Sequence, residues 1–286
     1  MPIAQTPKGS VYFAHVPKAG GSTVEDYLLR RFGPLWLHET AFAARGGRQS
    51  DIPMPTQHLT ARDAALVLPP DLLWSFAVVR DPLARLCSEY RFQTGASRSS
   101  RFGFSTWIRI VLGAARRDPR IYDNHIRPQD DIVPASAEVF RLEDGFDGLA
   151  ARLDAVTGQD TAGQDAGGQD TAGQDAAGQD TAGEGAGVAF GHLLKRAHEP
   201  IAIRRQDVAL IAGYYAADYD RFGYARPDPA AFPEDPRAAL RAAPARAMAR
   251  LLLARHRRRF LGAAPASVPV PVSAAGQPNR SARSEK

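Results

Sequence analysis

The chain has 286 residues, of which 44% are hydrophobic, and a formal net charge of +5. This is enough apolar material for one sizeable core, and no apolar stretch approaches the roughly 20 residues that a membrane-spanning helix needs. A single cysteine, Cys87, excludes an intrachain disulfide framework, and residues 1–10 contain no apolar run of signal-peptide length, so we expect a cytoplasmic protein.

Strand-like and helix-like segments alternate over the first 160 residues. Short apolar runs rich in β-branched and aromatic residues predict strands, and apolar residues at helical spacing predict helices. The predicted strands lie at 11–16, 74–79 and 138–142, and the predicted helices at 23–31, 83–92, 104–116 and 146–156. This alternation predicts an α/β fold, a single P-loop-like domain whose central parallel sheet is flanked by helices.

A five-residue repeat, GQDTA with small variations, occupies residues 158–182. It contains no large apolar residue and cannot contribute to a core, so we predict a disordered insertion over 158–184. Calcium-binding β-rolls also repeat Gly and Asp, but their nine-residue repeats carry an apolar core position that is missing here. The domain is expected to span 1–235 around this insertion.

Positive charge is concentrated at the C-terminal end. Residues 237–286 contain eleven Lys or Arg and one acid, Glu285. Arginines and leucines are interleaved over 236–262, which predicts a basic amphipathic helix, and 263–286 have the composition of a disordered tail. The helix could bind an anionic membrane or glycan, or it could cover part of the domain with its apolar stripe. We do not expect nucleic acid as a partner.

Residues 14–24 (AHVPKAGGSTV) have the composition of a loop that binds phosphate-like oxygens. Such a loop needs converging backbone N–H groups, a helix that begins at the anion, and a cation. Gly20 and Gly21, a helix beginning near Ser22, and Lys18 would supply them. The lysine precedes the glycines, whereas it follows them in a Walker A loop, which disfavours a P-loop kinase or ATPase. The alternative is a Gly-Gly turn with Ser22 as a simple N-cap.

A second anion-binding pattern follows the next predicted strand. Residues 76–90 read FAVVRDPLARLCSEY, with Arg80 at the strand end and Ser88 eight residues later on a predicted helix. An arginine can bind phosphate through two parallel hydrogen bonds, and a serine adds a hydroxyl donor. Taken alone, Arg80 could instead pair with Asp81 at the helix N-terminus, and Ser88 could be a solvated position.

In this order, the two patterns resemble the 5′-phosphosulfate loop and the 3′-phosphate motif of sulfotransferases that use 3′-phosphoadenosine 5′-phosphosulfate (PAPS). The sequence looks most like the carbohydrate branch that includes heparan sulfate 2-O-sulfotransferase and its bacterial relatives. Segments 124–129 (NHIRPQ), 141–143 (RLE) and 214–224 (YYAADYDRFGY) resemble the same branch. The resemblance implies transfer of a sulfuryl group from PAPS, without a metal, to a hydroxyl of a carbohydrate or glycolipid.

The resemblance also assigns roles to residues. Lys18 would contact the bridging oxygen and stabilise charge on the leaving phosphate. The cofactor-binding residues would be Lys18, Ala19, Gly20, Gly21, Ser22 and Thr23 for the phosphosulfate, and Arg80 and Ser88 for the 3′-phosphate. The transfer needs a base for the hydroxyl proton. His58, shortly before the second strand, resembles the base of the 2-O-sulfotransferase branch.

Three further residues are candidates for contact with the acceptor. His38 and Glu39 lie in a predicted loop, and His125 lies in the NHIRPQ segment. His15, inside the first strand, is expected to be a core residue. Two rival functions stay open. One is a nucleotide kinase, for which Mg²⁺ ligands and a Walker lysine are missing, and the other is a basic module that binds anionic surfaces.

Overall fold

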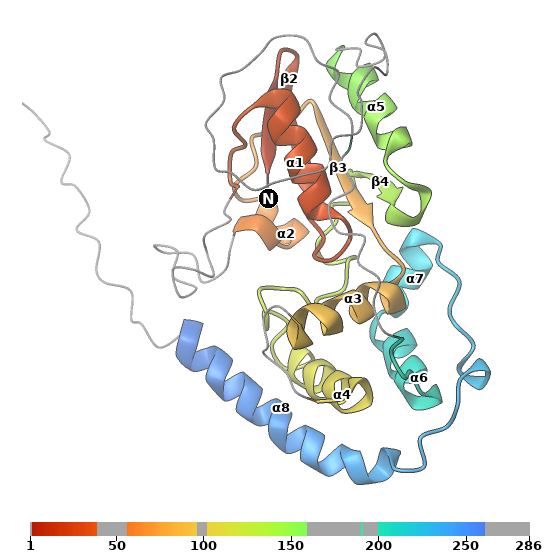
Figure 1. The fold of residues 1–286 in the computed structure, drawn as a ribbon. Coiled ribbons are helices and arrows are strands. Elements are labelled where there is room, and N and C mark those ends of the chain that lie inside the picture. The colour runs from red at the N-terminus through yellow and green to blue at the C-terminus, as the bar shows by residue number, and fades with distance from the viewer. Residues whose placement is uncertain (1, 39–55, 96–101, 159–189, 191–199, 261–286) are drawn as a thin grey trace, which may run out of the picture.

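The computed structural model describes residues 2–38, 56–95, 102–158, 190 and 200–260. A sheet with flanking helices forms one part of the molecule, and a group of helices forms the other (Figure 1). The sheet has the order β1-β2-β3-β4, with the strands β1 (Ile3–Thr6), β2 (Gly9–Ala14), β3 (Trp74–Val79) and β4 (Glu138–Arg141). The predicted α/β class is therefore confirmed.

The sheet is mostly, but not wholly, parallel. β2, β3 and β4 run in the same direction, whereas β1 pairs antiparallel with β2. The sequence analysis missed β1 because its four residues (IAQT) bury only Ile3 and Ala4, and so short an apolar run gives no periodic signal. The turn before β2 ends at Gly9, which has φ 138°. Ile3 and Trp36 then hold the N-terminus through two backbone hydrogen bonds of 2.9 Å.

The helices follow the sequence analysis closely. In chain order they are α1 (Gly21–Phe32), α2 (Ala61–Ala64), α3 (Pro82–Thr94), α4 (Phe104–Ala115), α5 (Asp147–Thr157), α6 (Arg205–Tyr214), α7 (Ala216–Phe222) and α8 (Ala238–Phe260). Short 3₁₀ turns lie at Thr56–His58, Leu142–Asp144 and Pro229–Ala231. The bounds of α1, α3, α4 and α5 agree with the prediction within two residues. Residues 214–224, one of the segments that resemble the sulfotransferase branch, are divided at Tyr215 between α6 and α7.

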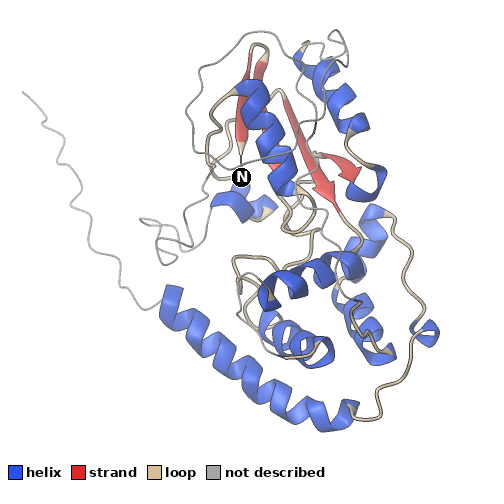
Figure 2. Cartoon of the chain, viewed as in Figure 1, coloured by secondary structure: helices blue, strands red, loops and turns tan. Residues whose placement is uncertain are grey.

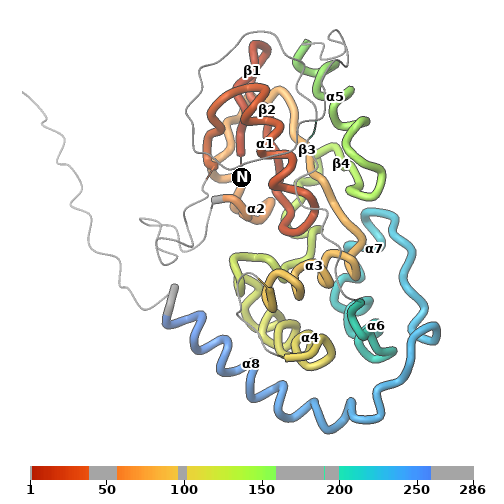
Figure 3. The backbone as a smooth tube through the Cα atoms, in the orientation of Figure 1, coloured from red at the N-terminus to blue at the C-terminus, as the bar shows by residue number. Residues whose placement is uncertain are grey.

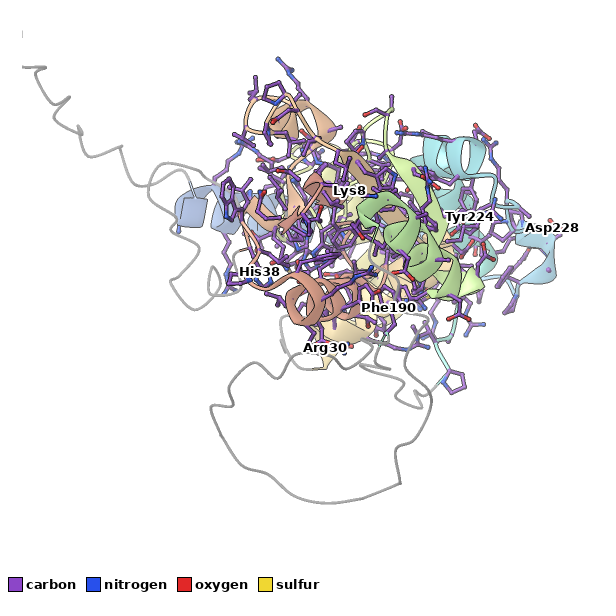
Figure 4. All side chains as sticks on the ribbon, turned by 90° about the horizontal axis from the view of Figure 1, so that it is seen from above. Lys8, Arg30, His38, Phe190, Tyr224 and Asp228 are labelled. Atoms are coloured by element: carbon purple, nitrogen blue, oxygen red, sulfur yellow. The ribbon has the colours of Figure 1, made fainter. Side chains whose placement is uncertain are left out.

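Helices cover both faces of the sheet, because alternate strand residues point to opposite sides. Phe13 and Phe76 pack with Leu28 of α1 and Leu153 of α5 on one face. Phe190 extends this layer, since its ring stacks on Tyr27 at 3.8 Å and on Phe146 at 4.7 Å, between α1 and α5 (Figure 4). The other face packs against α2, α7 and the segment around residue 132.

A third core lies between helices and the loop residues Ile121 and Ile126, beyond the end of β3 (Figure 2). It joins α3, α4, α6, α7 and α8 around Trp107 and Tyr215. α8 runs along α4 (Figure 3) and buries Ala249 and Leu253 there, while Arg246 and Arg250 are exposed. α8 therefore covers the domain with its apolar stripe, one of the two alternatives. None of the described helices is long and apolar enough to cross a bilayer.

The predicted disordered segments fall outside the described residues, except at their borders. Gly158, the first glycine of the repeat, ends α5 in the left-handed conformation with φ 68°. Residues 159–189 and 261–286 are not described.

Candidate active site

The loop from β2 to α1 has a backbone suited to an anion. Lys18 and Gly20 both have left-handed backbones, with φ 64° and 86°. Gly20 is the N-cap of α1, and in the described part of the chain no side chain caps this helix end and no acid lies in its first turn. The Thr23 N–H already donates to the Gly20 carbonyl oxygen at 3.0 Å, so it is the N–H groups of Gly21 and Ser22 and the positive end of the helix dipole that suit a negative ligand.

The two glycines of the loop are needed for different reasons. Gly20 has a positive φ, and a Cβ there would also lie 2.8 Å from Cδ1 of Leu142. A Cβ on Gly21 would lie 1.7 Å from Nε2 of His15, which is buried and paired through Nδ1 with Glu25 at 2.7 Å. His15 is thus a core residue, as expected, and it fixes the path of the loop. Ser22 is not a simple N-cap, since Gly20 occupies that position and no side chain caps it among the described residues.

Lys18 and Arg80 come from consecutive strand ends and meet. Because β2 and β3 are parallel, the loops that follow them lie at the same edge of the sheet. Arg80 donates from Nη1 to the carbonyl oxygen of Lys18 at 3.3 Å. Burial lowers the pKa of Lys18, Glu89 raises it, and Arg80 lowers it further. The Lys18 ammonium also lies 4.4 Å from the ring centre of Phe92.

Arg80 is positioned by its backbone rather than by Asp81. The Gln129 side chain accepts from the Arg80 N–H and donates to the Arg80 carbonyl, both at 2.9 Å. Asp81 is occupied elsewhere, since Oδ1 accepts from the Ala84 N–H at 2.8 Å and caps α3. The guanidinium therefore bonds the Lys18 loop, which favours an anion-binding role over a helix-capping ion pair.

Ser88 shares a face of α3 with Arg91 and Phe92, three and four residues further on. Phe92 lies against Lys18, so this face looks onto the same loop. Sequence reasoning missed Arg91, whose Nε is buried without a hydrogen-bond acceptor among the described residues. Its charge also lowers the pKa of Arg80, after the larger effect of burial. Arg91 lies three residues after Ser88, and this helical spacing is the sequence signal that could have predicted its position.

Three histidines form a row beside the loop. The ring of His58 lies edge-on to His15 at 4.7 Å and to His125 at 5.0 Å. Nδ1 of His58 lies 3.3 Å from the His15 carbonyl oxygen, so it donates there and leaves Nε2 as an acceptor. Burial lowers the pKa of His58 well below its ordinary value, and the charges of His15 and His125 lower it further. His58 is therefore neutral at neutral pH.

The row ends on a buried carboxylate. Nδ1 of His125 lies 2.9 Å from Oε2 of Glu89, and Gln93 donates to the other oxygen at 2.6 Å. Burial raises the pKa of Glu89, but His125, Gln93 and Lys18 together lower it below its usual range. Glu89 is thus ionised, and the anion-binding loop and the histidine row share one electrostatic environment. Sequence reasoning gave Glu89 no role, and nothing in its local pattern marks it.

A family model described as Sulfotransferase family matches residues 2–225. The chain belongs to the sulfotransferase family. It is a sulfotransferase-family enzyme, and membership implies transfer of a sulfuryl group from PAPS. Neither the curated proteins nor the solved structures contain a match to it. The matched residues include both anion-binding loops and the histidine row, and they end before α8.

The site of this sulfotransferase fits its anionic donor. Among the described residues, the N-terminus of α1 has no side-chain cap and suits a phosphosulfate together with the Lys18 ammonium, and the guanidinium groups of Arg80 and Arg91 suit a second phosphate.

The NHIRPQ segment holds the sulfotransferase site together. Asn124 donates to the carbonyl oxygen of His58 at 2.7 Å, His125 contacts Glu89, and Gln129 holds Arg80. Tyr122, Asp123 and Asn124 all have positive φ, which turns the chain sharply enough to present both ends of the segment to the site. The resemblance predicted the segment without predicting these structural roles.

Arg85 ties the two halves of the sulfotransferase site to each other. Its guanidinium donates to the carbonyl oxygens of Arg127 at 2.7 Å, His125 at 3.2 Å and Pro17 at 3.5 Å. Arg85 is only 2% exposed, and its charge lowers the pKa of Asp218 against the larger effect of burial. It therefore positions the loops from inside the protein rather than touching the donor.

The acceptor candidates of the sulfotransferase have different outcomes. His38 lies at the Glu25 end of the row, with Nε2 3.6 Å from a Glu25 oxygen, and Figure 4 shows it on the opposite side of the molecule from Tyr224. His125 lies at the Glu89 end, inside the site. Glu39 lies outside the described residues.

Proposed function

We propose that the enzyme transfers the sulfuryl group of PAPS to a hydroxyl of a carbohydrate or glycolipid, with Lys18 at the leaving group and His58 as the base. One observation carries the proposal. The Phe92 ring centre lies 4.4 Å from the Lys18 ammonium and 6.0 Å from the His125 ring, so the anion-binding cation and the histidine row border the same region. An in-line transfer requires the leaving group and the acceptor with its base to approach one sulfur atom from opposite sides.

The donor would bind across two neighbouring loops. PAPS supplies a sulfuryl group bound to phosphate, and transfer leaves the bisphosphate behind. Lys18 would stabilise the charge that develops on the leaving oxygen, and residues 19–23 would bind phosphosulfate oxygens at the N-terminus of α1. Arg80 and Ser88, with Arg91 beside them, would bind the 3′-phosphate. The strand, loop and helix geometry supports a P-loop-like fold in which the lysine precedes the glycines.

The proton of the acceptor hydroxyl would pass to Nε2 of His58. Its Nδ1 donates to the His15 carbonyl oxygen, which fixes the tautomer that leaves Nε2 unprotonated. Asn124 holds the His58 backbone from the other side. His125 is the second candidate for the base, because its contact with the ionised Glu89 orients an imidazole in the same way.

The acceptor is proposed to be anionic or membrane-bound in part, since the exposed arginines of α8 create a positive field. Arg246 and Arg250 point away from the α4 contact. Such a field attracts anionic partners at low ionic strength. Packing against α4 and attraction of an anionic partner are compatible roles for α8, because its apolar stripe and its basic face are different sides of the helix.

The proposal is tested by binding before turnover. Adenosine 3′,5′-bisphosphate should raise the melting temperature of the full chain, and MgATP should not. Lys18→Ala should keep its fold and lose turnover of labelled PAPS with glycan or glycolipid extracts, because charge stabilisation at the leaving oxygen is lost. Arg80→Ala should mainly weaken bisphosphate binding. Near-wild-type turnover in Lys18→Ala would refute the loop assignment.

A further inference from the structure

A cavity lies between α4 and α8, outside the donor site. Its volume is about 210 Å³, below the roughly 300–1,000 Å³ common for small-molecule sites, so it suits a short chain rather than a whole drug-sized ligand. Its lining is largely apolar and consists of Phe102, Trp107, Ile110, Val111, Tyr122, Met248, Leu251, Leu252 and Arg255. An apolar space of this kind is a poor site for ordered water, which needs several polar partners.

One charged group gives the cavity a means of orienting a ligand. The indole nitrogen of Trp107, although Trp107 lines the cavity, is itself buried and is not exposed to the open space. Arg255 is exposed at the α8 side of the lining and adds a positive charge.

The cavity adjoins the histidine row on two sides. Tyr122 lines it, and the Tyr122 carbonyl oxygen accepts from the N–H of His125 at 3.0 Å. Phe102 also lines it, and its carbonyl oxygen accepts at 3.0 Å from Tyr90, the residue that follows Glu89. Two walls of the cavity therefore belong to segments bonded to the ones that carry His125 and Glu89.

The electrostatics of Tyr122 agree with this position. Burial raises the pKa of Tyr122 to about 12, Glu89 raises it as well, and Arg255 lowers it. Both charges affect the same phenol, so Tyr122 lies near the buried carboxylate of Glu89 as well as near Arg255 of the cavity.

We propose that the α4–α8 cavity binds the apolar part of an amphipathic acceptor, such as the alkyl chain of a glycolipid, while the hydroxyl-bearing head lies at the histidine row. The inference rests on the proposed function for the identity of the head group. The apolar lining selects the chain, Arg255 adds a positive charge at the α8 side, and the histidine row determines which end reacts. A free sugar would use only the head-group half of this site.

The binding test uses octyl β-D-glucoside below its micelle-forming concentration, with methyl β-D-glucoside as the same head group without the chain. Titration calorimetry on the full chain should show octyl glucoside binding at least roughly tenfold more tightly, because its methylenes leave water. Equal affinities would overturn the proposal. No binding of octyl glucoside would also overturn the proposal, because it would mean that the cavity is not open to a ligand.

Two leucines of α8 provide a matched pair of variants. Leu251 is 62% exposed and lines the cavity, whereas Leu240 is 76% exposed and does not. Leu251→Asp should weaken octyl glucoside binding at least roughly tenfold, and Leu240→Asp should leave it unchanged, since only one removes apolar contact with the chain. Equal losses in both variants, with unchanged melting temperatures, would overturn the proposal.

Leu252→Trp fills the same cavity from a third position and serves if Leu251→Asp fails to fold. It should block octyl glucoside but leave adenosine 3′,5′-bisphosphate binding intact. Undiminished octyl glucoside binding in this variant would place the ligand elsewhere and overturn the proposal. Failure of the proposed function has a separate signature, which is the absence of bisphosphate binding in the wild-type chain.

Discussion

Nδ1 of His125 lies 2.9 Å from Oε2 of Glu89, and the His125 ring lies edge-on to His58 at 5.0 Å. The proposed base therefore has a second imidazole as its neighbour, and that imidazole is held by a buried carboxylate. Charge on His125 lowers the pKa of His58, so the protonation states of the two rings are linked. The kinetic effects of variants at His58, His125 and Glu89 must therefore be interpreted together.

His58→Ala should lower kcat by roughly a hundredfold or more, as expected for loss of a general base, with the affinity for adenosine 3′,5′-bisphosphate nearly unchanged. His58→Gln should not restore kcat, because an amide cannot accept the proton. Single-turnover kinetics with labelled PAPS measures the rate of transfer in both variants. An active His58→Ala beside an inactive His125→Ala would move the base to His125. An inactive Glu39→Gln beside an active His58→Ala would move it to Glu39.

The pH profile should show the depressed pKa of His58. A base works only when unprotonated, and burial holds the pKa of His58 well below 6.5. Plotted against pH, kcat/KM should therefore stay level as the pH falls through about 6.5 and decrease only at lower pH. A decrease centred on the ordinary histidine pKa would argue against His58.

Folding stability has a related pH dependence, which serves as the control for that profile. The pKa values of His15 and His58 are both lower in the folded chain than their ordinary value, chiefly because of burial. The unfolded chain therefore binds more protons at low pH, and this contribution to stability is lost as the pH falls below about 6.5. Urea unfolding at each pH separates loss of fold from loss of the base.

Gly21→Ala should destabilise the fold by about 1–3 kcal/mol, the usual cost of overpacking, because its Cβ would lie 1.7 Å from Nε2 of His15. The double variant with His15→Ala should recover part of that loss. Gly148→Ala is the matched control, since it lies near the start of α5 with no atom within 4 Å of its Cβ. It should be neutral or stabilising in thermal melts. A neutral Gly21→Ala would contradict the interlocking of loop and histidine.

Deletion of residues 159–182 should leave the melting temperature unchanged or slightly raised. Thr157 accepts a hydrogen bond from Arg31 at 3.4 Å, and Phe190 stacks on Tyr27 at 3.8 Å, so the insertion leaves and rejoins the fold at one turn of α1. Shortening such a loop changes the closure entropy by only about 0.6 kcal/mol per halving. Phe190→Ala should lower the melting temperature, as a positive control. A large loss on deletion would mean that the repeat is structured.

Truncation after Pro236 should destabilise the protein, because it uncovers the α4 surface that packs against Ala249 and Leu253. The basic face is better tested by Arg246→Gln with Arg250→Gln, which leaves that packing intact. The double variant should raise KM for an anionic acceptor at low salt and have less effect at high salt. An unchanged KM would remove the basic face from acceptor binding.

Elements with strong local patterns could be predicted from the sequence, and contacts between distant segments could not. The strand at 74–79 and the helices α1, α3, α4 and α5 follow from apolar spacing, and the two anion-binding loops follow from their residue types. Glu89 and Arg91 were missed because their roles depend on what the fold places beside α3. Gln129 was recognised only as part of a resemblance, since its bonds to Arg80 cross 49 positions.

The hydrogen bond from Arg80 to the Lys18 carbonyl makes the two donor loops one mechanical unit. Arg80, which is proposed to bind the 3′-phosphate, also bonds the loop that carries Lys18. Lys18 has a left-handed backbone in that loop. A donor that lacks the 3′-phosphate, such as adenosine 5′-phosphosulfate, would leave Arg80 free to adopt other rotamers. The hydrogen bond that holds the Lys18 loop would then be weakened. Discrimination between the two donors would then appear in the rate of the chemical step as well as in affinity. Such a coupling would let the enzyme discriminate between the two donors without a second binding site.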